Sequence, residues 1–107
     1  MTPLADAAPV FAALGDATRL AIVARLCAQG PLSIVRLTDG THVSRQAVTK
    51  HLHAMQRAGL VRDERAGRER VWRLQARRLA EVRMYLQQIS KQWDDAIARL
   101  RAHVEDD

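Results

Sequence analysis

Apolar residues recur at helical spacing through the first 58 residues, in segments that short polar breaks separate. The first segment fits a helix over residues 6–14, which the Gly15-Asp16 pair ends. Asp16 is a suitable N-cap for a second helix, ATRLAIVARLCAQ, which Gly30-Pro31 closes. The apolar positions of the first helix are Val10, Phe11 and Leu14, and the expected apolar stripe of the second is Leu20, Val23, Leu26 and Cys27.

Two further helices follow, and the second of them carries a polar face. Ser33 is the expected N-cap of a short helix that ends near Asp39, and "GTHV" turns the chain. Ser44 caps a longer helix over about 44–58, which Gly59 stops. Its apolar positions, Val48, Leu52 and Met55, predict an inward stripe supported by Ala47 and His51. That arrangement leaves an outward polar set in the first turns: Arg45, Gln46, Thr49 and Lys50.

After Gly59 the hydrophobic pattern changes to the alternation of strands. The stretch LVRDERAGRERVWRL contains two β-prone runs about a turn at Gly67, which predicts a hairpin over about 60–75. Trp72 and Leu74 lie on one face of that hairpin, and Val71 and Arg73 lie on the other.

The last third of the chain predicts one long helix over about 77–104. Its apolar seam repeats at steps of three and four residues and consists of Leu79, Val82, Leu86, Ile89, Trp93, Ile97, Leu100 and Val104. A helix of this length spans roughly 40 Å at ~1.5 Å per residue, which exceeds the core that so short a chain can build. The seam therefore favours packing on a partner helix over packing on the chain's own domain.

Length and composition fit a single ordinary domain over residues 1–107, mainly α with a small β-hairpin. Hydrophobic residues make up 48% of the 107 and charged residues 27%, so nothing indicates disorder. The N-terminal stretch has no signal-peptide pattern, and no run approaches the ~20 apolar residues of a membrane span. We therefore expect a cytoplasmic protein with no membrane partner. The single cysteine, Cys27, is expected to pack in the core rather than to serve as a redox switch.

The positive charge of the chain is concentrated in its middle. Residues 41–78 carry ten basic and three acidic residues, a balance of +7 that exceeds the net charge of +5 for the whole chain. Residues 1–40 are neutral, and residues 79–107 carry −2. Such an asymmetry is typical of a surface that neutralises phosphates, so we expect double-stranded DNA as a partner.

The polar helix face and the basic hairpin have the chemistry that DNA requires. Arg and Lys side chains match guanine O6 and N7, Gln matches adenine N6 and N7, and Thr can contact a thymine methyl group. Arginines about the hairpin turn suit the minor groove or the backbone. Either feature alone could be an ordinary solvated surface, but the hairpin directly follows the helix. The predicted DNA-binding residues are Ser44, Arg45, Gln46, Thr49, Lys50, His53, Arg65, Arg68 and Arg70.

These segments resemble the ArsR/SmtB family of bacterial winged helix-turn-helix repressors over nearly the whole chain. FAALGDATRLAIVARL is similar to the family's opening signature, VSRQAVTKHLHAMQRAGLV to its recognition helix and RAGRERVWRL to its wing. The resemblance implies a transcriptional repressor that binds a palindromic operator as a homodimer, joined through the first and last helices, and that an inducer releases. The expected dimerisation residues are Val10, Phe11, Leu14, Leu86, Ile89, Trp93, Ile97 and Leu100.

The metal sites of the family are not matched. Ser33, Val35 and Thr38 stand where arsenic and cadmium sensors have thiolates. The last helix has one histidine, His103, beside an acidic chain end of Glu105, Asp106 and Asp107 that reads as a frayed terminus. The sequence thus indicates the metal-independent branch of the family, with no metal or cofactor. It leaves open whether a small-molecule inducer exists.

Two other functions compete with this interpretation. A winged-helix protein–protein module would explain the apolar seam equally well, and a metal- or redox-responsive repressor would use His103 or Cys27 as its switch. An enzyme is not expected, because the sequence has no catalytic Ser/His/Asp or Cys/His pattern and no phosphate-binding glycine loop. The neighbours Asp94 and Asp95 point about 100° apart on a helix and do not converge.

Overall fold

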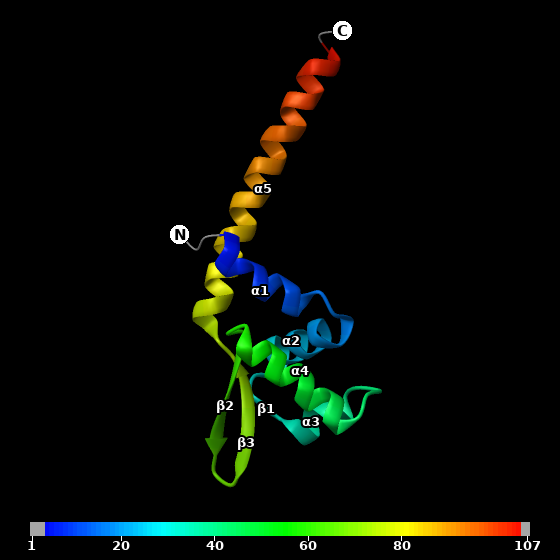
Figure 1. The fold of residues 1–107 in the computed structure, drawn as a ribbon, viewed down its shortest axis with the longest axis vertical. Coiled ribbons are helices and arrows are strands. Elements are labelled where there is room, and N and C mark those ends of the chain that lie inside the picture. Colours follow the sequence, from blue (N-terminus) through cyan, green and yellow to red (C-terminus); the bar gives the residue numbers. More distant parts are fainter. Residues whose placement is uncertain (1–3, 106–107) are drawn as a thin grey trace.

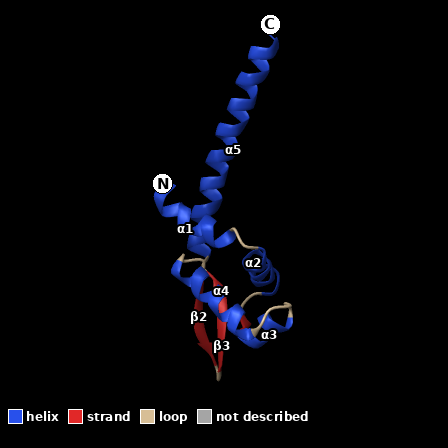
Figure 2. Cartoon of the chain, turned by 45° about the vertical axis from the view of Figure 1, so that its right-hand side comes forward, coloured by secondary structure: helices blue, strands red, loops and turns tan. Residues whose placement is uncertain are grey.

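The computed structural model describes residues 4–105 and is mainly helical with a small antiparallel sheet, as the sequence predicts (Figure 1). The short elements of residues 4–74 form a head from which one long helix projects (Figures 1 and 2). The elements in chain order are α1 (Leu4–Leu14), α2 (Ala17–Gln29), β1 (Leu32–Ser33), α3 (Ile34–Asp39), α4 (Arg45–Arg57), β2 (Val61–Ala66), β3 (Glu69–Leu74) and α5 (Ala76–Glu105).

The starts of α2, α3 and α4 confirm the three predicted N-caps. The carboxylate of Asp16 accepts a hydrogen bond from the Arg19 amide at 3.0 Å, which lowers the pKa of Asp16. The hydroxyl oxygens of Ser33 and Ser44 accept from backbone amides three residues later, at 3.3 and 3.1 Å. Each cap satisfies an amide that the helix leaves unpaired, so these helix starts are encoded locally.

The core lies among the first four helices and one face of the sheet. The inward stripe predicted for α4 is confirmed, because Val48, Leu52 and Met55 are fully buried. Val10 of α1 also has 0% exposure, so it offers no surface to a second copy and belongs to the core rather than to the predicted dimer face. Phe11 and Leu14 are only partly buried against this core.

The stripe predicted for α2 is confirmed at Leu26 and Val23, which lie in or against the core, and is wrong at Leu20 and Cys27. Ile22 and Leu26 are buried, whereas Leu20 is 51% exposed and Cys27 is exposed. On a helix of 3.6 residues per turn, Leu20 and Cys27 lie roughly 120–140° away from the buried line. The expected packing role of Cys27 is therefore wrong for the single chain, because α2 faces α4 and β3 with its other side.

The predicted hairpin is confirmed, and a third strand extends it. β2 and β3 pair antiparallel with Val61 opposite Leu74, and Gly67 adopts φ 66° in the turn, which favours glycine. β1 pairs with the other edge of β3, with Ser33 opposite Val71, so the strand order is β1-β3-β2. β3 is thus the central strand, and both Val71 and Trp72 are buried although they alternate in direction.

The long helix α5 leaves the head after about its first ten residues, since Tyr85 still lies beside Phe11 of α1. Val82 is buried and Leu79 packs against the core, but from Leu86 onward most of the predicted apolar seam is uncovered. The exposed fractions of Leu86, Ile89, Trp93, Leu100 and Val104 range from 41% to 71%, and Ile97 is half-buried. We call residues 86–105 the arm. It does not pack on its own domain, and it extends the molecule to 67 Å against 30 and 23 Å in the other directions (Figure 1).

Within residues 4–105, no helix has by itself the length and apolar composition needed to cross a membrane. Residues 6–14 and 17–29 meet those two criteria only as a combined pair, and the two helices are bent by 97° relative to each other. Ile22 and Leu26, in the second of these helices, are core residues of the head.

Candidate nucleic-acid interface

The first turns of α4 present the polar face that the sequence predicts. Arg45, Gln46 and Lys50 are exposed, and none of their side chains makes a hydrogen bond or ion pair to the described residues 4–105. Thr49 is partly buried, and its hydroxyl donates to the Arg45 carbonyl at 2.8 Å, which leaves its methyl group and oxygen lone pairs for other contacts. Ser44 caps the helix through its oxygen, so its hydroxyl proton remains available.

The predicted wing arginines fall into two groups. Arg65 and Arg68, on either side of the Gly67 turn, are exposed and unpaired among the residues that the structure describes. Arg70 instead forms an ion pair with Asp63 across the hairpin, and its guanidinium lies 5.8 Å from the centre of the Trp72 ring. Two free cations thus mark the wing tip, whereas the third has partners within the fold.

A closed set of contacts connects the middle of α4 to the wing. His53 lies edge-on to Trp72 with ring centres 5.8 Å apart, and its Nδ1 is 3.3 Å from the Gln56 side-chain oxygen. Gln56 in turn donates to the Asp63 carboxylate at 3.1 Å, and Asp63 pairs with Arg70, which lies over Trp72. We call these five residues the helix–wing bracket. It connects α4 to both strands of the wing.

The bracket contains residues that the sequence analysis missed. Asp63, Gln56 and Trp72 were not predicted as site residues, although the turn position fixes the hairpin register and places Asp63 and Arg70 diagonally on one face. The hydrogen bond from Arg70 is the main cause of the lowered pKa of Asp63. Because that pKa is lowered on folding, the contribution of the pair to stability is present above the ordinary carboxyl pKa. It is lost as the pH falls through the lowered value.

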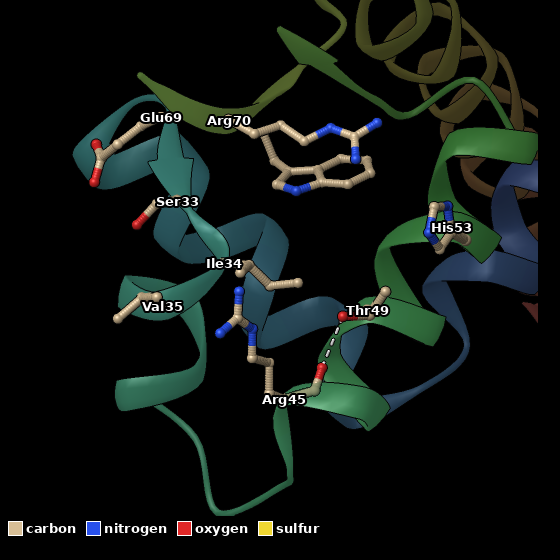
Figure 3. A pocket seen from close by; sticks show the side chains of 9 residues that line it. Ser33, Ile34, Val35, Arg45, Thr49, His53, Glu69 and Arg70 are labelled. Atoms are coloured by element: carbon tan, nitrogen blue, oxygen red, sulfur yellow. Dashed lines mark hydrogen bonds between the residues drawn. The ribbon is translucent and has the colours of Figure 1, made fainter. Parts of the chain in front are cut away.

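A cleft of about 340 Å³ lies between the start of α4, α3 and strand β3 (Figure 3). Arg45 extends from α4 towards Ile34 on one side of the cleft, and Arg70 lies on the other side (Figure 3). The Arg70 guanidinium lies over the Trp72 ring. Glu69 is the acidic group at its rim. The cleft thus separates the polar face of α4 from the wing and is bordered by cationic groups. The full lining is Ser33, Ile34, Val35, Arg45, Thr49, His53, Glu69, Arg70 and Trp72.

The four histidines and the cysteine do not converge in the described part of the chain. No three His, Cys, Asp or Glu side chains of residues 4–105 come together as metal ligands would. Asp106 and Asp107, which the sequence analysis placed beside His103, lie outside the described residues.

Two helices joined by a turn, with the start of the second exposed and a β-hairpin directly after it, define a winged helix-turn-helix DNA-binding domain. Residues 14–64 match the family model of a helix-turn-helix domain. The solved structure of an ArsR-like transcriptional regulator from Rhodococcus sp. RHA1 superposes with a TM-score of 0.75, at 38% identity over 90% of both chains. The chain belongs to the ArsR/SmtB family of DNA-binding transcriptional regulators.

Further relatives are regulators of the same kind. The HTH-type transcriptional regulator Rv2034 of Mycobacterium tuberculosis is 48% identical over 66% of this chain. The HTH-type transcriptional repressor SmtB of the same species is 34% identical over 85%. The chain spans 65% of the length of each of these two relatives. The homodimeric winged helix-turn-helix DNA-binding domain Mb0332 of Mycobacterium bovis has a TM-score of 0.66 at 26% identity, covering 83% of this chain and 82% of its own.

Proposed function

We propose that this protein is a sequence-specific transcriptional repressor that binds a palindromic operator as a homodimer and needs no metal inducer. The observation that carries the proposal is the exposed, unpaired donor set of Arg45, Gln46 and Lys50 at the start of α4. Side chains at this end of a recognition helix contact base edges in the major groove, where the helix dipole also favours phosphate.

The chemistry of each predicted DNA-binding side chain determines which base or backbone group it contacts. Arg45 and Lys50 are suited to guanine, Gln46 to adenine and the Thr49 methyl group to thymine. Arg65 and Arg68 at the wing tip bind the backbone or the adjacent minor groove, because they are free cations on a narrow turn. Ser44 donates its hydroxyl proton to a phosphate. His53 and Arg70 act mainly through the bracket, since their rings and charges already have partners.

A second copy of the chain is the partner that the arm requires. The exposed apolar seam from Leu86 to Val104 would be costly to leave in water, and a two-fold dimer buries both seams against each other. Two recognition helices about 34 Å apart then face successive major grooves of a palindrome. A dimer seated on a promoter excludes polymerase, in keeping with the repressor named among the relatives and with the homodimeric Mb0332 domain.

Fluorescence anisotropy tests the proposal with a labelled duplex from upstream of the protein's own gene and a scrambled duplex of equal length. We expect the native duplex to bind ~10³-fold or more tightly, and both affinities to fall with salt. Addition of zinc or a chelator should leave the native affinity unchanged. Equal and weak binding of both duplexes, together with shallow salt dependence, would instead favour a protein–protein module that retains the winged fold.

The bracket provides a separate prediction for Asp63→Asn. Loss of the carboxylate leaves Arg70 free to bind any phosphate. It also removes the ion pair that connects the bracket to strand β2, so the variant should discriminate less between native and scrambled duplexes. On scrambled DNA we expect the slope of log affinity against log salt to steepen by up to ~0.9, the value for one added phosphate contact. Glu64→Gln is the matched control, because Glu64 pairs with Arg73 outside the bracket. If both variants lower discrimination equally, net charge and not the bracket is responsible.

A further inference from the structure

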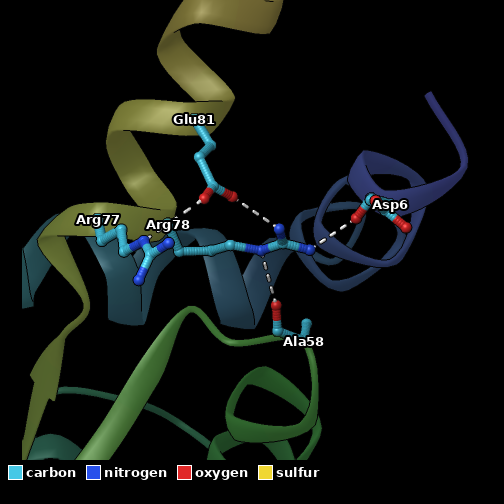
Figure 4. A network of polar contacts seen from close by, with 5 residues as sticks. All are labelled: Asp6, Ala58, Arg77, Arg78 and Glu81. Atoms are coloured by element: carbon cyan, nitrogen blue, oxygen red, sulfur yellow. Dashed lines mark hydrogen bonds and ion pairs between the residues drawn. The ribbon is translucent and has the colours of Figure 1, made fainter. Parts of the chain in front are cut away.

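Arg78 lies in the first turn of α5, where this helix meets α1 and the end of α4. Its three guanidinium nitrogens donate in three directions (Figure 4). Nη2 donates to the Asp6 carbonyl in α1 at 2.6 Å, Nε to the Ala58 carbonyl at the end of α4 at 3.3 Å, and Nη1 to the Glu81 carboxylate in α5 at 2.8 Å. One side chain thus connects the C-terminal end of α4, the proposed recognition helix, to both α1 and α5.

Apolar side chains of α5 also pack on the head. Leu79 and Val82 pack on the core, and the rings of Phe11 and Tyr85 lie 5.9 Å apart. Apolar contacts are non-directional, whereas hydrogen bonds prefer a narrow range of angles. The guanidinium also has a planar geometry that a lysine ammonium cannot reproduce. The direction of α5 relative to the head is therefore set most sharply by Arg78.

The neighbouring arginine provides a contrast. Arg77 has a side chain that is 95% exposed, and its only recorded partner within the described chain is Glu81, at 3.9 Å. Arg78 pairs with the same carboxylate but has a side chain that is 24% exposed. The two residues have the same charge and adjacent positions, yet only Arg78 connects α5 to α1 and α4.

A small change in the direction of α5 has a large effect at its far end. The 20-residue arm spans about 30 Å at ~1.5 Å per residue, so a rotation of about 10° displaces its tip by about 5 Å. That exceeds the ~3.4 Å rise of one base pair. We infer that Arg78 is a positioning residue that fixes the angle between the arm and the head, and thereby the spacing of operator half-sites that the dimer accepts. The second part of this inference rests on the proposed function.

The angle itself can be measured without DNA. Spin labels on cysteines introduced at Lys50 in the head and Arg99 in the arm, in a Cys27→Ala background diluted with unlabelled protein, report their distance within one protomer. We expect a narrow distance distribution for the otherwise unchanged chain and for Arg77→Ala, and a broader or shifted one for Arg78→Ala. Circular dichroism establishes that each variant is folded, and Arg78→Lys should be intermediate. An unchanged distribution in folded Arg78→Ala overturns the inference.

Operator spacing is the second measurement. Duplexes built from the upstream sequence, with one or two base pairs inserted or removed between half-sites, are compared by anisotropy. Arg78→Ala should lose about tenfold or more of the preference for the native spacing, because it removes three hydrogen bonds donated by a charged guanidinium. Arg77→Ala should keep that preference, and both variants should remain dimers. Retained spacing preference in Arg78→Ala refutes the link to half-site spacing. If the unsubstituted protein fails to prefer its native duplex, the proposed function fails, and the distance measurement still decides the role of Arg78.

Discussion

Replacing Ile89 or Trp93 by glutamate should convert the protein to monomers and weaken operator binding by ~10³-fold or more, towards the affinity for random DNA. Both side chains lie on the uncovered seam of the arm, where they are 41% and 67% exposed in the single chain. In a dimer they become buried, and an unpaired carboxylate there carries a large desolvation cost. A monomer then presents one recognition helix instead of two. Sedimentation equilibrium and anisotropy measure the two effects.

Met84 provides the control for this experiment. It is 60% exposed on the same helix but lies roughly 180° from Trp93, away from the seam. Met84→Glu should therefore remain dimeric and bind the operator as the unsubstituted protein does. If Ile89→Glu and Trp93→Glu also remain dimeric, the partner surface lies elsewhere on the chain and the exposed seam serves another interaction.

The parts of the fold that depend on neighbouring residues could be predicted from the sequence. The caps at Asp16, Ser33 and Ser44 and the hairpin turn at Gly67 each involve bonds or backbone angles within a few residues. Strand β1 was missed because two residues are too short to show an alternation. It forms only because β3, about 40 positions later, supplies the edge on which it pairs.

Apolar periodicity indicates that a helix face is covered, but not what covers it. Val10 was assigned to a partner surface and is fully buried in the chain's own core, while the seam beyond Val82 is uncovered in the single chain. On α2 the apolar residues occur nearly all round the helix. Leu26 was therefore placed correctly in the core but Leu20 and Cys27 were not, and packing selected Ile22 beside Leu26. These outcomes depend on how elements dock, which no local pattern contains.

In the candidate site, too, features within one helix could be predicted from the sequence, whereas contacts between elements could not. The outward set at the start of α4 follows from the helical period once the inward stripe is known, and Arg45, Gln46 and Lys50 are exposed as predicted. The bracket joins two elements at a specific angle, so its contacts between Gln56 and Asp63 and between His53 and Trp72 could not be anticipated from spacing within either element.

Arg45→Ala should weaken binding to the operator by ~1–3 kcal/mol, about 5- to 150-fold, and relax the sequence preference at one base pair. Arg45 is exposed, has no partner among the described residues and projects from the first position of α4. A guanidinium there can donate two hydrogen bonds to one guanine, and alanine leaves those base acceptors unpaired. A panel of duplexes with single base-pair changes, measured by anisotropy at fixed salt, locates the affected position.

Arg68→Ala removes the same side chain from the wing tip and separates base contact from charge. Arg68 follows the Gly67 turn and is exposed, so its expected contact is a phosphate or the minor groove rather than a major-groove base edge. Its loss should weaken native and scrambled duplexes alike and reduce the salt slope by ~0.9. Because both variants lose one positive charge, electrostatics alone predicts the same result for each. Equal losses on both duplexes for Arg45→Ala would mean that this face of α4 binds the backbone and that specificity arises from other residues.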